Sequence, residues 1–143
     1  MDIFYISASF VAGLVAGILT TKALSLSKEN KIVDKEKLLE ECFGEHMYVD
    51  RFSLVQARDW IKMRQENINN GAKALVMKIT PETLASLGKD VEITQNMDNY
   101  LAIAIINGST KEMEDSILVK YDKLDEKLEG LLAKGNGTLV VGE

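Results

Sequence analysis

Hydrophobic and polar positions divide the chain at about residue 22. Residues 3–21 carry no charged side chain, and no polar stripe with the 3.6-residue period of a surface helix runs through them. As a helix, these nineteen residues would span roughly 28 Å at ~1.5 Å per residue, close to the ~30 Å hydrocarbon core of a bilayer. The pattern predicts a single transmembrane helix that anchors the protein through residues 1–22.

A cleaved signal peptide would also place an apolar segment here. Such a signal needs a cationic start, whereas this chain begins with Met1 and Asp2. The stretch 23–25 has the small residues of a cleavage site, but it directly follows Lys22. We therefore favour an uncleaved signal-anchor and keep a secreted protein with a cleaved signal as an alternative.

The basic residues near the predicted span all follow it. Lys22, Lys28 and Lys31 lie on its carboxyl-terminal side, and no Lys or Arg precedes it. Positively charged flanks stay on the cytoplasmic side of a membrane. The sequence therefore predicts a single-pass protein of the cell membrane whose residues 22–143 are cytoplasmic.

Small residues recur inside the predicted span. Ser9, Gly13 and Gly17 stand four positions apart, and small residues at this spacing form a groove in which a second membrane helix can approach closely. They are candidate helix-packing residues, through which the protein could form a homo-oligomer. Gly and Ala are also common in membrane helices for other reasons, so both interpretations stay open.

Beyond a polar juxtamembrane connector at residues 23–37, short apolar segments and capped helical patterns fill residues 38–143. Strands are predicted at residues 46–52, 74–79, 91–94, 100–106, 116–122 and 138–141. Helices are predicted to follow capping residues, which are Asp34, Ser53, Thr80 and Asp122. Strands outnumber helices and do not alternate with them, so we expect a soluble α+β domain with a mixed sheet and helices packed mainly on one face.

Charge and cysteine content narrow the function classes. The chain has a net charge of −5, and residues 38–143 carry twelve Lys/Arg against eighteen Asp/Glu. A nucleic-acid partner is not expected, because binding to phosphates requires a cationic surface. The single cysteine, Cys42, cannot form an internal disulfide.

No residue pattern indicates a metal, a cofactor or a catalytic site. Cys42 and His46 stand four apart, but zinc takes three or four protein ligands, and the chain has one Cys and one His. Asp98, Asp115 and Asp122 lie near strand ends, where acids can act in catalysis, although Asp122 has a simpler explanation as a helix cap.

We therefore expect a membrane-anchored, non-enzymatic interaction or scaffold module with an unknown protein partner. The alternative of a different class is a small membrane-associated enzyme that uses loop carboxylates. A deep polar pocket that gathers Asp98, Asp115 or Asp122 would favour the enzyme, whereas an apolar surface patch would favour partner binding.

Overall fold

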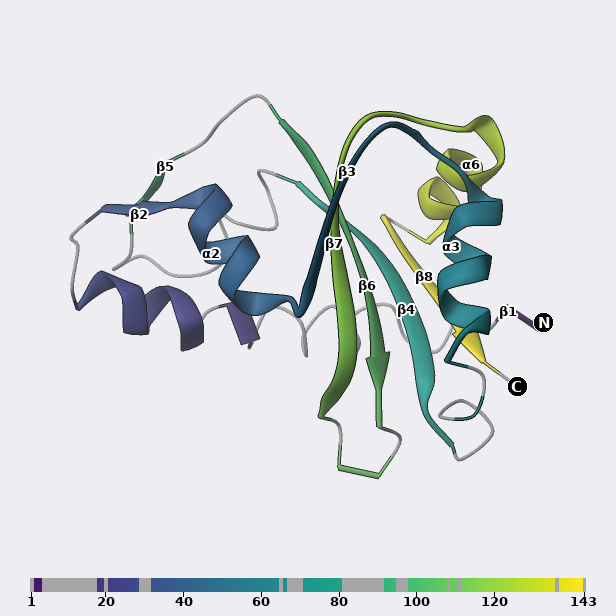
Figure 1. Ribbon diagram of the computed structural model, residues 1–143, viewed down its shortest axis with the longest axis horizontal. Coiled ribbons are helices and arrows are strands. Elements are labelled where there is room, and N and C mark those ends of the chain that lie inside the picture. The colour runs from purple at the N-terminus through teal and green to yellow at the C-terminus, as the bar shows by residue number, and fades with distance from the viewer. Residues whose placement is uncertain are drawn as a thin grey trace.

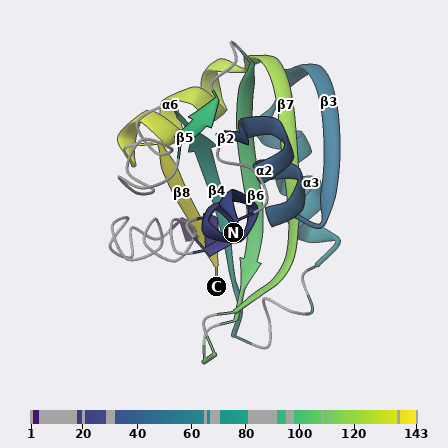
Figure 2. The same cartoon turned by 90° about the vertical axis from the view of Figure 1, so that its left-hand side faces the viewer.

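A six-stranded mixed sheet forms the centre of the molecule (Figure 1, Figure 2). The computed structural model describes residues 2–3, 18–19, 21–28, 32–64, 66, 71–80, 92–94, 98–107, 109–110, 112–135 and 137–142. In spatial order, the strands are β1 (Asp2–Ile3), β8 (Thr138–Gly142), β4 (Lys73–Ile79), β6 (Asn99–Ile106), β7 (Met113–Leu124) and β3 (Glu45–Phe52). β3 runs parallel to β7, and the other neighbours are antiparallel. The predicted α+β class and mixed sheet are confirmed.

A second, two-stranded parallel sheet joins β2 (Ile32–Asp34) to β5 (Glu92–Thr94). It contributes Val33, which is buried with the residues of α2 (Lys35–Cys42), and Ile93 packs against the same cluster. The predicted strand at residues 91–94 therefore pairs outside the main sheet. The expected helix after Thr80 falls on residues 81–91, which lie outside the described part of the chain.

Alternate side chains of the central strands enter two separate hydrophobic clusters. On β4, Leu75 and Met77 face the cluster that α2 covers, which we call the α2-face cluster. Ala74 and Val76 face the cluster on the opposite side of the sheet. That second cluster is covered by α3 (Leu54–Lys62) and α6 (Glu126–Lys134). In Figure 1, α2 lies on one side of the sheet, and α3 and α6 lie on the other.

The prediction that helices pack mainly on one face is therefore wrong. The physical reason is visible in β4 and β6, whose apolar runs at residues 74–77 and 100–106 are buried on both faces of the sheet. A strand of this kind needs cover on each side of the sheet. Helix periodicity reveals which stripe of a helix is buried, but not which face of the sheet that stripe covers.

Most helix starts agree with the predicted caps. Asp34 accepts a hydrogen bond from the amide of Lys37 (3.0 Å), and Ser53 forms the expected capping box with Gln56. The prediction for the last helix is wrong, because Asp125 and not Asp122 accepts from Leu128 N (2.8 Å). Pairing of β7 with β3 continues to Leu124, so Asp122 is still in the strand.

The structure describes three short segments within and next to the predicted transmembrane span, at residues 2–3, 18–19 and 21–28. Ile3 lies in β1, which pairs with β8, so the predicted helix does not begin there. Residues 18–19 and 21–27 are helical, and Leu19 and Ala23 are fully buried in the α2-face cluster. The described residues do not include the predicted helix-packing residues Ser9, Gly13 and Gly17, nor Lys31. Of the other two flanking lysines, Lys22 is half-buried and Lys28 is exposed. No helix in the described part of the chain is both long and apolar enough to cross a membrane.

Candidate functional site

A pocket of about 610 Å³ opens where β4 and β7 end and β6 begins. Antiparallel pairing brings these three strand ends to the same edge of the sheet, and the first residue of α2 and one residue of α6 complete the lining. Six charged residues of the described part of the chain line it, namely Lys35, Lys78, Lys123, Asp98, Asp122 and Glu129. The pocket is therefore polar, with apolar walls from Ile79, Leu124 and two tyrosine rings.

Lys35 is the buried charged residue of this pocket, with a relative exposure of 2%. It is the first residue of α2, and its Nζ lies 5.1 Å from the centroid of the Tyr100 ring. Desolvation lowers the pKa of Lys35, and the charge of Asp98 partly opposes that shift. Among the described residues, Lys35 makes no ion pair and no side-chain hydrogen bond.

Two carboxylates of the pocket, Asp98 and Asp122, are already bound by side chains of neighbouring strands. Asp98 Oδ2 lies 3.2 Å from Lys120 Nζ, which is also 3.7 Å from Glu36 Oε1. Asp122 accepts a hydrogen bond from the hydroxyl of Tyr48 (3.2 Å), and the negative charge of Asp122 raises the pKa of Tyr48. These carboxylates are therefore held by side chains of β3 and β7.

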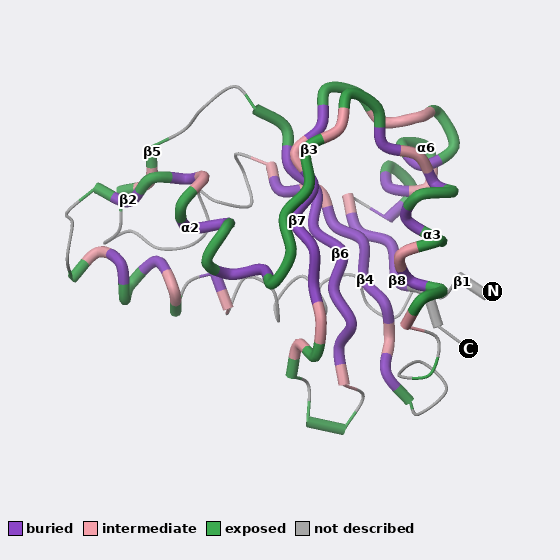
Figure 3. The backbone as a smooth tube through the Cα atoms, viewed as in Figure 1, coloured by how far each residue is buried: buried purple, intermediate pink, exposed green. Residues whose placement is uncertain are grey.

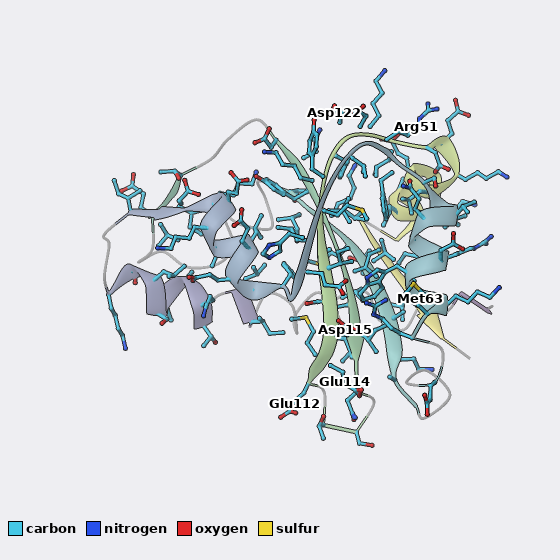
Figure 4. The ribbon with its side chains drawn as sticks, viewed as in Figure 1. Arg51, Met63, Glu112, Glu114, Asp115 and Asp122 are labelled. Carbon is cyan, nitrogen blue, oxygen red and sulfur yellow. The ribbon has the colours of Figure 1, made fainter. Side chains whose placement is uncertain are left out.

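Of the acids singled out in the sequence, the pocket brings Asp98 and Asp122 together but not Asp115. Figure 4 shows Asp122 and Asp115 toward opposite ends of β7. Asp115 forms an ion pair with Arg64, and Asp125 caps α6. Two of the three acids therefore share one polar pocket, which partly meets the condition that would favour an enzyme.

Arg64 connects the end of α3 to the sheet. Its guanidinium lies 3.6 Å from the centroid of the Trp60 ring, and it pairs with Asp115 and with Glu45 (3.2 Å). Trp60 also donates from Nε1 to Glu45 (3.0 Å). Trp60 is thus part of a structural contact between α3, β3 and β7.

The Cys42 and His46 pair points to no metal site. Cys42 is buried, and His46 Nε2 lies within hydrogen-bonding distance of the carbonyl oxygens of Glu40 (2.7 Å) and Phe43 (3.0 Å). Throughout the described ranges, no group of three or more His, Cys, Asp or Glu side chains is arranged to hold a metal ion.

The outer edge of β3 is the second feature of interest. β3 is exposed along most of its eight residues (Figure 3), including Met47 (39%) and Tyr48 (60%). In the part of the chain that the structure describes, β3 pairs only with β7. In Figure 2, β3 forms one margin of the sheet, with no strand beyond it.

No protein-family model, curated protein or solved structure matches this chain. The candidate site therefore rests on its own geometry. Sequence reasoning identified Asp98 and Asp122 from their positions near strand ends, but it missed Lys35. Lys35 follows a helix cap in a charged stretch, where a lysine is normally solvated, and its burial arises only from tertiary packing.

Proposed function

We propose that this protein is a membrane-anchored, non-enzymatic interaction module that docks through the outer edge of β3. The observation that carries the proposal is an exposed strand of eight residues whose described partner lies on one side only. A strand edge of this kind presents unpaired backbone N–H and C=O groups, to which another strand can add.

Two features of the sequence support the anchor. Residues 3–21 are uncharged, and Lys22, Lys28 and Lys31 follow them, as expected for a single-pass span with a cytoplasmic domain. The proposal has a structural consequence, because Leu19 belongs to this stretch and is also buried in the α2-face cluster. Insertion of the chain through Thr21 would withdraw Leu19 from the domain, so membrane and domain compete for this side chain.

The partner that we propose for β3 is a second copy of the same strand. Antiparallel pairing about a two-fold axis at Tyr48 places Glu45 opposite Arg51 and His46 opposite Asp50. The opposite charges of Glu45 and Arg51 on facing positions favour such pairing. An axis at Met47 or at Val49 would instead place Glu45 opposite Val49 or Arg51 opposite Met47, so these opposite charges face each other only with the axis at Tyr48. Anchoring both copies in one membrane would raise their effective concentration and allow a weak contact to form.

Cysteine cross-linking tests this register. In a Cys42→Ala background, Tyr48→Cys should form a covalent dimer under mild oxidation of membranes that contain the full chain. Directly opposed residues of an antiparallel pair have Cα atoms about 4.5–5.5 Å apart, within the roughly 4.4–6.8 Å that a disulfide spans.

Asp50→Cys is the matched control, because the two copies of position 50 would be separated by four residues along the strand, roughly 13 Å. The proposal predicts a strong dimer band for Tyr48→Cys and little for Asp50→Cys. Equal cross-linking of the two variants, or none from either, would contradict pairing through β3.

The second candidate function is a small membrane-associated enzyme, which the presence of Asp98 and Asp122 in one pocket favours. Lys120 and Tyr48 already bind these two carboxylates. A proton-transfer role would require those contacts to be broken, so the interaction module is the better supported proposal.

A further inference from the structure

We infer that the pocket at Lys35 binds the phosphate group of a small organic molecule. This inference is independent of the proposed docking through β3. It starts from the burial of Lys35, which is 2% exposed and still lines the pocket. An ammonium group withdrawn from water is costly unless an acceptor compensates it.

The described part of the chain does not supply that acceptor. Asp98, the acid whose charge acts on Lys35, is already ion-paired with Lys120. Asp122 accepts from Tyr48. The ring face of Tyr100 offers Lys35 a cation–π contact, but such a contact leaves the N–H donors of the ammonium available for an anion.

The remaining cations of the pocket point to the same ligand chemistry. Lys78 and Lys123 also line it, and neither has an ion pair among the described residues. Lysine side chains act as point charges that suit a phosphate.

The size and walls of the pocket fit an organic body attached to that phosphate. A volume of about 610 Å³ lies within the range of small-molecule sites. Ile79, Leu124 and Tyr121 provide apolar walls next to the lysines. Glu129 lines the pocket from α6, and its negative charge should weaken binding of a phosphate.

The phosphate could belong to a soluble metabolite or to a lipid headgroup, and competitive acetylation distinguishes the two. The purified full chain in detergent micelles is labelled with a trace of acetic anhydride, and each lysine is quantified by mass spectrometry. Soluble glycerol phosphate is added in one arm, and phosphatidic acid is mixed into the micelles in the other.

Protection of the half-buried Lys78 and the exposed Lys123, but not of the exposed Lys62 and Lys127, supports the site. Protection by glycerol phosphate assigns it to soluble organic phosphates, and protection by phosphatidic acid alone assigns it to a lipid headgroup. Absence of protection in both arms would overturn the inference, and this readout needs no variant.

Titration calorimetry with the probe that protects gives the second readout. Lys35→Met should weaken binding about tenfold or more, the size expected for loss of one charged hydrogen bond. Glu129→Gln should tighten binding because it removes a repulsive charge, and Lys127→Met should leave it unchanged. Binding by a folded Lys35→Met variant at the affinity of the unchanged chain would also overturn the inference.

Discussion

Burial displaces the pKa values of two titratable residues of α2, Lys35 and Cys42. Desolvation lowers the pKa of Lys35. Desolvation also raises the pKa of the Cys42 thiol to about 11, with a smaller opposing effect from Lys22 and a reinforcing one from Glu41. In both cases burial disfavours the charged form. The two residues differ in what surrounds them, since Lys35 lines a pocket and Cys42 is packed in the α2-face cluster.

We expect Cys42 to be unreactive toward thiol reagents in the folded protein at pH 8. The thiolate is the reactive form, and a pKa of about 11 leaves very little thiolate at that pH. Reaction with a chromogenic disulfide should be slow in buffer and should become fast in guanidinium. Reaction of the folded chain at the rate of a small free thiol would contradict this burial. Membrane topology should accordingly be probed with an introduced, exposed cysteine.

Among the secondary-structure elements, α6 shows how the capping residue of a helix can be predicted about one turn too early. Asp122 is the cap that the sequence predicts, but Asp125 accepts the hydrogen bond from the first turn of α6. Asp125 also accepts a hydrogen bond from Leu54 N (3.4 Å) at the start of α3. One side chain therefore serves the beginnings of both helices on this face of the sheet.

Asp125→Ala should lower the free energy of unfolding by about 1 kcal/mol or somewhat more, the usual cost of losing a helix cap. Asp122→Ala removes an exposed contact with Tyr48 and should cost less than about 0.5 kcal/mol. Thermal unfolding of the two full-length variants, followed by circular dichroism, compares them. An equal loss, or a larger loss for Asp122→Ala, would contradict the assignment of the cap.

Local features of the elements could be predicted from the sequence. The capping box at Ser53, the strand at residues 100–106 and the alternation of Ile117, Leu118 and Val119 between two faces are each encoded by neighbouring residues. The end of α3 at Lys62, the division of helices between two faces and the burial of Lys35 depend on contacts between distant segments. For the same reason, the pocket could not be predicted beyond its individual acids.

For the whole molecule, the main question is how the amino-terminal segment relates to the sheet. β1 pairs with β8, and Leu19, Ala23 and Leu26 are buried in the same cluster as α2. The packing of the domain therefore extends into residues that hydropathy assigns to the span and its connector. The same apolar side chains cannot be buried both in a bilayer and in the domain. The cellular location of the full chain therefore decides where they are buried.

Carbonate extraction of membranes from cells that produce the full chain tests the proposed anchor most directly. A variant with Gly13→Lys and Gly17→Lys, which interrupts the uncharged stretch of residues 3–21, serves as the matched control. We predict that the full chain stays in the membrane pellet through high salt and alkaline carbonate, because an apolar span inserts in the bilayer whereas a peripheral protein adsorbs to it. The variant should be recovered in the supernatant. Release of the full chain by carbonate would contradict a membrane-anchored module.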